Sequence, residues 1–200
     1  MYEAGTKMAF VGRRRAVYSS LARRAQVRAG ETVIDIGSGT GALTSALAAY
    51  AGPSGHVLGI DPSRDMIAFA RRLAPANVTY AVASADSLPA PDGSVDVVAS
   101  ALAVHHIPPE ERTSAMTEIN RVLRPGGRML LADFQPPRGR LARWVTRVVT
   151  GSRMADNDPA NELVQLCEAA GLTVAERGRQ GAFFVWVRGA KDRPTPEETR

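Results

Sequence analysis

Residues 33–41 have the sequence Val-Ile-Asp-Ile-Gly-Ser-Gly-Thr-Gly, an apolar run that carries one carboxylate and ends in a glycine-rich turn. The surrounding pattern predicts a strand at 32–36 and a helix over about 41–51. A glycine turn lets the backbone approach a ligand closely, because no Cβ intervenes. It also points the first N–H groups of the helix at that ligand. The stretch therefore predicts a binding turn at the carboxyl end of a strand.

The rest of the chain repeats this alternation of strand and helix. Apolar runs predict further strands at 56–60, 78–82, 95–101 and 128–133. Helical patterns lie at about 63–73, 110–124 and 159–170. Two final β-like runs, 173–176 and 182–187, are separated only by a short turn, so we expect an antiparallel hairpin at one edge. The pattern predicts an α/β fold with a mostly parallel seven-stranded sheet and helices on both faces.

Length and composition indicate one globular domain, since the chain has 200 residues and 44% of them are apolar. We expect an N-terminal segment over 1–29 with a leading helix at about 13–29, a ligand-binding domain over 30–189 and a flexible tail over 190–200. No run approaches the roughly 18 apolar residues of a membrane span, and we recognise no signal peptide. A single cysteine, Cys167, excludes an internal disulfide and a cysteine-based metal cluster. These features favour a cytoplasmic location.

The net charge of +5 comes almost entirely from arginine. A basic surface is compatible with nucleic acid or an anionic membrane as a partner. The arginines are scattered along the chain rather than packed into one tract. A compositional preference for arginine is therefore the favoured explanation, and nucleic acid is not the favoured partner.

Asp35 distinguishes two cofactor classes that the glycines alone leave open. The spacing Gly37-x-Gly39-x-x-Ala42 also satisfies a permissive dinucleotide fingerprint. A carboxylate at the end of a buried strand is costly unless it meets a cation or several donors. It would repel the pyrophosphate of a nicotinamide cofactor, whereas S-adenosylmethionine carries an ammonium and a sulfonium. Asp35 therefore favours S-adenosylmethionine, with acceptance of backbone N–H bonds in the turn as its alternative role.

Two further acidic residues follow later strands. Asp61 lies 22 positions after Gly39, close to the offset of about 20 that is typical of an acid that binds ribose hydroxyls. It is also a good N-cap for the next helix. Asp86 follows the third strand and could accept a hydrogen bond from the exocyclic amine of adenine, although a surface-loop role is equally ordinary. Together these acids predict a nucleoside ligand.

Four segments in this order resemble the class I S-adenosylmethionine-dependent methyltransferase family, in particular its subgroup of quinone and other small-molecule methyltransferases. They are residues 33–41, residues 59–63 (Gly-Ile-Asp-Pro-Ser), residues 85–89 (Ala-Asp-Ser-Leu-Pro) and residues 119–128 (Ile-Asn-Arg-Val-Leu-Arg-Pro-Gly-Gly-Arg). The likeness covers roughly residues 30–135, and the terminal hairpin fits the antiparallel seventh strand of that family. It implies a Rossmann-like three-layer sandwich that binds S-adenosylmethionine and releases S-adenosylhomocysteine.

The resemblance implies a role for each motif position. Asp35 and the backbone of Gly37, Ser38 and Gly39 would surround the methionine moiety. Asp61 would hold the ribose hydroxyls.

The adenine and the methyl group would meet later positions. Met66 would be an apolar neighbour of the adenine, and Asp86 and Ser87 would contact it. Ala101 and Leu102, at the end of the fourth strand, would line the path of the sulfonium methyl.

His105 and His106 directly follow the fourth strand, at the edge of the sheet where ligands bind. Imidazole titrates near neutrality, so either side chain could accept a proton from an acceptor. Histidines at this place could instead only pack or hydrogen-bond the loop. His106 is weakly favoured as the base, and no third nearby ligand suggests a metal.

The sequence predicts a methyltransferase that acts on a small, partly apolar molecule by in-line methyl transfer. A nucleic-acid methyltransferase and an NAD-dependent oxidoreductase are the alternatives. An amphipathic, arginine-containing stretch within 134–158 could be a lid over the acceptor, a packed helix or a minor contact with a membrane surface. The acceptor atom and the oligomeric state stay open.

Overall fold

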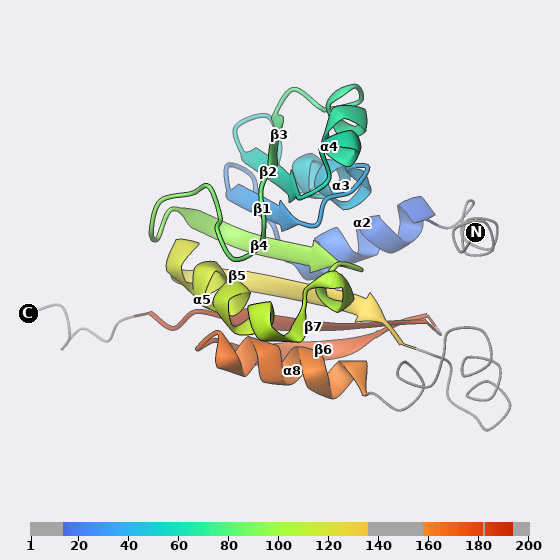
Figure 1. The fold of residues 1–200 in the computed structure, drawn as a ribbon. Coiled ribbons are helices and arrows are strands. Elements are labelled where there is room, and N and C mark those ends of the chain that lie inside the picture. Colours follow the sequence, from blue (N-terminus) through green and yellow to red (C-terminus); the bar gives the residue numbers. More distant parts are fainter. Residues whose placement is uncertain (1–13, 136–157, 182, 194–200) are drawn as a thin grey trace, which may run out of the picture.

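The computed structural model describes residues 14–135, 158–181 and 183–193. Its centre is a seven-stranded sheet with the order β3-β2-β1-β4-β5-β7-β6 (Figure 1). The first five strands pair in parallel, and β7 is antiparallel to both β5 and β6. The strands are β1 (Thr32–Ile36), β2 (His56–Asp61), β3 (Val78–Val82), β4 (Val95–Ala101), β5 (Leu123–Phe134), β6 (Thr173–Gln180) and β7 (Phe184–Ala190).

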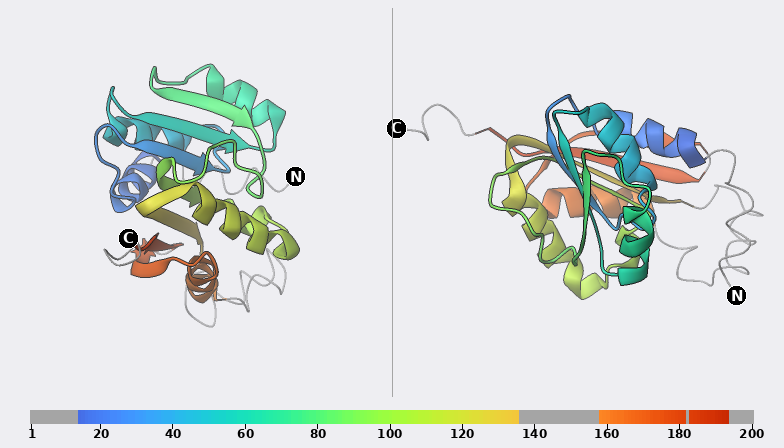
Figure 2. Two further views of the ribbon diagram at one scale, coloured as in Figure 1. Left: turned by 90° about the vertical axis from the view of Figure 1, so that its left-hand side faces the viewer. Right: turned by 90° about the horizontal axis from the view of Figure 1, so that it is seen from above.

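Helices cover both faces of this sheet (Figure 2). Those on one face are α2 (Arg14–Arg24), α3 (Ala42–Ala51) and α4 (Arg64–Arg71). Those on the other are α5 (Arg112–Val122) and α8 (Pro159–Ala169). Two short 3₁₀ turns, η1 (Val104–His106) and η2 (Pro109–Glu111), connect β4 to α5. The prediction of a three-layer α/β sandwich with an antiparallel edge is confirmed.

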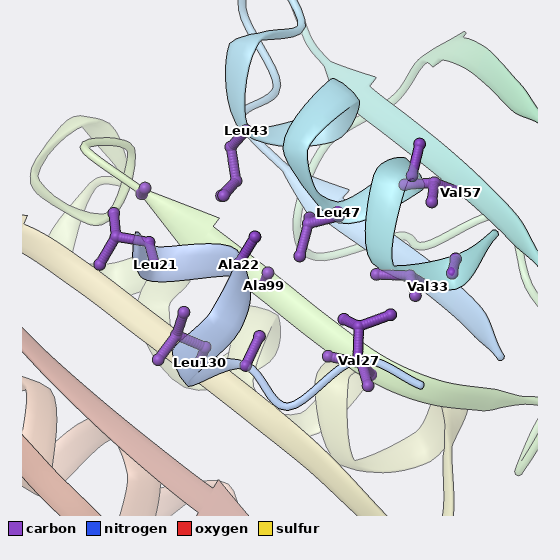
Figure 3. Packing of buried hydrophobic residues seen from close by; sticks show 14 of the residues in the cluster. Leu21, Ala22, Val27, Val33, Leu43, Leu47, Val57, Ala99 and Leu130 are labelled. Atoms are coloured by element: carbon purple, nitrogen blue, oxygen red, sulfur yellow. The ribbon is translucent and has the colours of Figure 1, made fainter. Parts of the chain in front are cut away.

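Alternate residues of the central strands enter two separate cores, as the pleat of a strand requires. Val33 of β1 belongs to the same buried cluster as Leu21 of α2 and Leu47 of α3, and each is 1% exposed or less (Figure 3). Ile34, the next residue along β1, enters the core under α5 and α8 instead. Each fully buried side chain of this size contributes about 1.5–3 kcal/mol to stability. The same alternation directs Asp35 toward the α3 face.

The boundaries of the C-terminal strands differ from those expected. β5 begins at Leu123, inside the stretch predicted as the end of a helix, because Leu123 pairs with Val95 of β4. β6 extends to Gln180 and β7 runs over Phe184–Ala190. Lys191 continues the ladder, since its backbone exchanges hydrogen bonds with Gly126 and Gly127. The first two residues of the predicted tail are therefore part of the sheet.

The leading helix belongs to the same body as the sheet. α2 buries Leu21 and Ala22 against α3 and the strands, and it ends at Arg24 before Gln26, which has a positive φ of 54°. The amphipathic stretch at 141–149, for which a lid or a membrane contact was considered, lies outside the described residues. In the part of the chain that is described, no helix combines the length and apolar character needed to cross a membrane.

Candidate functional site

The β1–α3 turn has the backbone conformation that its glycines allow. Gly37, Gly39 and Gly41 have φ values of 70°, 51° and 83°, in the left-handed region that other residues rarely adopt. A Cβ added at Gly37 would overlap the Cβ of Ala103, in the loop after β4. A Cβ at Gly41 would overlap the hydroxyl of Tyr80. The turn is therefore packed tightly between β3 and the β4 loop, and both positions require glycine.

Ser38 lies in the middle of this turn and is 7% exposed. Its backbone N–H donates to the Ile60 carbonyl at 2.9 Å, which ties the turn to β2. Its hydroxyl is buried and has no hydrogen-bond partner among the described residues. A buried polar group without a partner is costly and uncommon in folded proteins. The hydroxyl of Ser38 thus retains an unused capacity to donate and accept a hydrogen bond inside the turn.

Asp35 lies beneath the turn and is 1% exposed. Its Oδ2 accepts a hydrogen bond of 2.6 Å from the Thr44 hydroxyl on α3. Burial raises the pKa of Asp35 to about 7, although the hydrogen bond from Thr44 opposes that rise. Burial likewise raises the pKa of Tyr80, whose phenol also interacts with Thr44. The carboxylate therefore sits where a cation brought from outside would strongly favour its ionised form.

Asp61 ends β2 and connects two loops. Its Oδ2 accepts from the Gly39 N–H at 3.0 Å, and its Oδ1 accepts from the Ser63 N–H at 2.9 Å. Each carboxylate oxygen can accept a further hydrogen bond, so the side chain can still bind ribose hydroxyls. Ser63, rather than Asp61, caps α4 through a 3.3 Å bond from the Met66 N–H. The N-cap role considered for Asp61 is thus filled by its neighbour.

The remaining predicted adenine contacts lie at the surface. Met66, in the first turn of α4, is 40% exposed, which is high for a large apolar side chain. Asp86 and Ser87 are exposed in the loop between β3 and β4. That loop closes a turn in which the Ser87 N–H donates to the Ser84 carbonyl at 3.3 Å. These side chains are accessible to a ligand that extends outward from Asp61.

A strained residue directly follows β4. Ala101 is 9% exposed, and Leu102 has a φ of 60°, unusual for a residue that is not glycine. A left-handed conformation costs roughly 1–2 kcal/mol in such a residue. The N–H of Leu102 donates to the Ala132 carbonyl of β5 at 2.9 Å, which helps to hold this geometry. Backbone strain of this kind is often found at functional sites.

His105 is paired with Asp133, a residue that sequence reasoning did not single out. His105 Nδ1 lies 2.7 Å from Asp133 Oδ1, and the His105 backbone N–H donates to Asp133 Oδ2 at 3.1 Å. Asp133 is 6% exposed, whereas the His105 side chain is 34% exposed. The hydrogen bond that the His105 ring donates to Asp133 raises the pKa of His105. A buried carboxylate thus orients one nitrogen of the ring and leaves Nε2 for another partner.

His106 has a different environment. Burial and the neighbouring His105 ring lower the pKa of His106, and the two ring centroids are 4.0 Å apart. No hydrogen bond from its ring to another described residue orients it. The weak preference for His106 as a base therefore gains no geometric support, while His105 gains a partner.

The sheet order brings these residues to one edge. β1 and β4 are neighbours whose following loops diverge to opposite faces, and this is the place where ligands bind in open α/β sheets. The contact between Gly37 and Ala103 joins the two loops directly. Among the described residues, no group of three or more His, Cys, Asp or Glu side chains could hold a metal ion.

Comparisons with known proteins agree with this geometry. Residues 33–127 match a protein-family sequence model that is described as a methyltransferase domain. The chain is 38% identical to a ubiquinone/menaquinone biosynthesis C-methyltransferase of Hahella chejuensis over 116 residues, which are 56% of this chain and 46% of that protein. It is 33% identical over 157 residues to an uncharacterised 37.1 kDa protein in transposon TN4556 of Streptomyces fradiae, covering 74% of this chain and 45% of the relative. The chain thus spans a little under half of each relative.

The fold also recurs in solved structures. A methyltransferase of Aquifex aeolicus described as dependent on S-adenosylmethionine superposes with a TM-score of 0.72 at 22% identity, over 86% of this chain and 88% of that one. At that identity the likeness concerns the fold alone. The family match, the curated relatives and the glycine turn with its acidic neighbours point the same way: residues 33–127 match the methyltransferase-domain family, and the chain is similar in sequence to C-methyltransferases of quinone biosynthesis.

Proposed function

We propose that this chain catalyses methyl transfer from S-adenosylmethionine to a small, partly apolar acceptor. The observation that carries the proposal is the β1–α3 turn. Three left-handed glycines bring the backbone close to the ligand space, and the buried hydroxyl of Ser38 between them has no hydrogen-bond partner among the described residues. The carboxylates of Asp35 and Asp61 flank the turn and supply the negative charge that suits a cationic cofactor.

The cofactor would extend along the carboxyl edge of the sheet from β4 toward β3. Its methionine moiety would lie on the backbone of Gly37, Ser38 and Gly39, with Asp35 acting from beneath through its charge. The ribose hydroxyls would donate to Asp61, whose orientation is already fixed by two backbone N–H groups.

The two ends of the cofactor would meet different surfaces. The adenine would lie on exposed Met66, with Asp86 and Ser87 at its edge. Ala101 and the strained Leu102 would face the sulfonium methyl.

The pH dependence of cofactor affinity tests the position of Asp35. Its pKa of about 7 in the unliganded chain means that half the molecules carry a neutral acid at that pH. The cofactor ammonium binds the ionised form better, so affinity should increase as the pH rises through 7. We expect S-adenosylhomocysteine to bind about tenfold more tightly at pH 8 than at pH 6 by calorimetry.

The matched variant is Asp35→Asn, which keeps the size of the side chain but cannot ionise. It should bind about 1–3 kcal/mol more weakly at pH 8. It should also lose most of the difference between pH 6 and pH 8. A pH dependence that is identical in the two proteins would show that another group, such as a histidine, causes it.

His105 would act as the general base for acceptors that lose a proton on methylation. In the step proposed, the acceptor atom attacks the methyl carbon as the carbon–sulfur bond breaks, and the sulfur leaves as neutral S-adenosylhomocysteine. The acceptor proton passes to Nε2 of His105, while Asp133 holds Nδ1–H and stabilises the imidazolium. Positioning and exclusion of water supply the rest of the rate enhancement.

The acceptor class is inferred from the surroundings and the relatives. Leu102 and Ile107 present apolar groups beside the histidines and are only partly covered. The Hahella chejuensis relative is named for ubiquinone and menaquinone biosynthesis, which favours an aromatic acceptor with an ionisable hydroxyl. Release of S-adenosylhomocysteine should be stimulated by phenols or hydroquinones with apolar substituents and not by RNA. Stimulation by RNA alone would instead identify a nucleic-acid methyltransferase.

A further inference from the structure

The β3–β4 loop (residues 83–94), which carries Asp86 and Ser87, is held by two side chains of α5. The N–H of Leu88 donates to Glu118 Oε2 at 3.0 Å. The carbonyl of the same residue accepts from Arg121 Nη2 at 3.1 Å. Both backbone polar groups of the residue after Ser87 are therefore bound to α5.

Arg121 also holds the second half of the loop. Its Nη1 donates to the Ala90 carbonyl at 2.9 Å and to Asp92 Oδ1 at 2.6 Å. Its backbone carbonyl accepts from the Gly93 N–H at 2.9 Å. A single residue of the helix thus contacts the loop at four places, from Leu88 to Gly93.

Glu118 and Arg121 fix each other as well as the loop. Arg121 Nε lies 2.7 Å from Glu118 Oε1, and Nη2 lies 2.8 Å from Oε2, so the pair is bidentate. This planar arrangement fixes the direction of the remaining guanidinium N–H bonds. The hydrogen bond from Arg121 lowers the pKa of Glu118, which keeps it an acceptor at neutral pH.

The pair is too exposed for stability to be its main effect. The side chains of Arg121 and Glu118 are 30% and 19% exposed, and the Asp92 side chain is 80% exposed. Partly exposed ion pairs contribute little to folding, typically under about 1 kcal/mol. Their geometric consequence is larger, because the turn closed by Ser84 and Ser87 directly precedes the anchored Leu88. The position of Asp86 follows from where Leu88 is held.

We infer that Arg121 and Glu118 are positioning residues that place Asp86 against the 6-amino group of the cofactor purine and so determine selectivity for adenine. The inference rests on the proposed function. An ionised carboxylate only accepts hydrogen bonds, so a correctly placed Asp86 binds an amine and repels a carbonyl at the same ring position. A displaced Asp86 would do neither.

The test compares two nucleosides whose purines differ at that ring position and in the proton that the 6-oxo purine carries on the adjacent N1. Affinities of the full chain for S-adenosylhomocysteine and S-inosylhomocysteine, whose purine carries a 6-oxo group, are measured by calorimetry. We expect the wild type to prefer the adenosine compound by about tenfold or more. Arg121→Ala should reduce this preference to less than threefold, as Asp86→Ala should. Glu118→Gln, which retains one oxygen acceptor but loses the ion pair, should give an intermediate ratio.

The matched control is Arg124→Ala. Arg124 comes from the same sequence motif, but its side chain is paired with Asp96 of β4 rather than with a residue of the loop. This variant should keep the wild-type preference, and melting temperatures identify any general loss of folding. An unchanged preference in folded Arg121→Ala and Glu118→Gln would overturn the inference, as would a wild type with no preference. A wild type that binds neither compound would refute the proposed function itself.

Discussion

Replacement of His105 by alanine is expected to lower kcat by about 10²–10⁴-fold with an acceptor that must lose a proton, the usual contribution of a general base. The KM for S-adenosylmethionine should change little, because His105 lies on the acceptor side of the proposed methyl position. Asp133→Asn should also lower kcat, since an amide cannot stabilise the imidazolium as the carboxylate does. Initial rates of S-adenosylhomocysteine release at saturating substrate measure both effects.

The pH–rate profile provides a second measurement of the same base. The hydrogen bond to Asp133 raises the pKa of His105, and only the neutral imidazole can accept a proton. The rate should therefore rise with pH through a value above the ordinary histidine pKa of about 6.5. His56, whose Nε2 lies 3.0 Å from the Thr79 hydroxyl on an exposed surface, provides a control in His56→Ala. A greater loss of kcat in His106→Ala than in His105→Ala would assign the role to His106.

Replacement of Gly37 by alanine is expected to destabilise the fold by about 3 kcal/mol. Two costs add, because alanine at a φ of 70° costs roughly 1–2 kcal/mol and its Cβ would overlap that of Ala103, an overpacking that typically costs 1–3 kcal/mol. For a chain of this size the melting temperature should fall by about 6–12 °C. Chemical denaturation of the unliganded protein gives the free energy directly.

Gly39→Ala separates the two costs of the Gly37 substitution. Gly39 also has a positive φ, of 51°, but a Cβ there would meet nothing within 4 Å. Its alanine variant should lose only the conformational part, about 1–2 kcal/mol. Equal destabilisation at the two positions would show that the contact between the β1 turn and the β4 loop adds nothing.

The fold could be predicted where the local pattern of apolar residues shows which positions are buried. Strands β1 to β4 are apolar runs bounded by turns, and the structure places them within a residue of the predicted bounds. In the structure β6 continues four residues beyond the predicted 173–176. This extension was not predicted because β6 is a polar edge strand, in which Arg177 and Arg179 follow Glu176 and hydrophobic patterning gives no signal. The start of β5 depends on pairing between Leu123 and Val95, which local periodicity does not encode.

The site was predictable in part for the same reason. Asp35, Gly37 and Asp61 lie in motifs in which the residue type and its place after a strand already indicate a ligand contact. The structure brings them to one edge of the sheet. Asp133 was missed because its importance arises from pairing with His105, 28 residues earlier in the chain. The one available signal was a carboxylate at the end of the apolar strand 128–133, the same signal that identified Asp35. Leu102 gave no signal, since its strain is a property of the backbone.

The measurement that tests the central claim most directly is a parallel calorimetric titration of the full chain with S-adenosylhomocysteine and with NADH. If the β1–α3 turn and its carboxylates form an S-adenosylmethionine site, S-adenosylhomocysteine should bind with one site per chain. NADH, whose pyrophosphate would meet the charges of Asp35 and Asp61, should show no saturable binding at the same concentrations. Saturable binding of NADH together with no binding of S-adenosylhomocysteine would contradict the account.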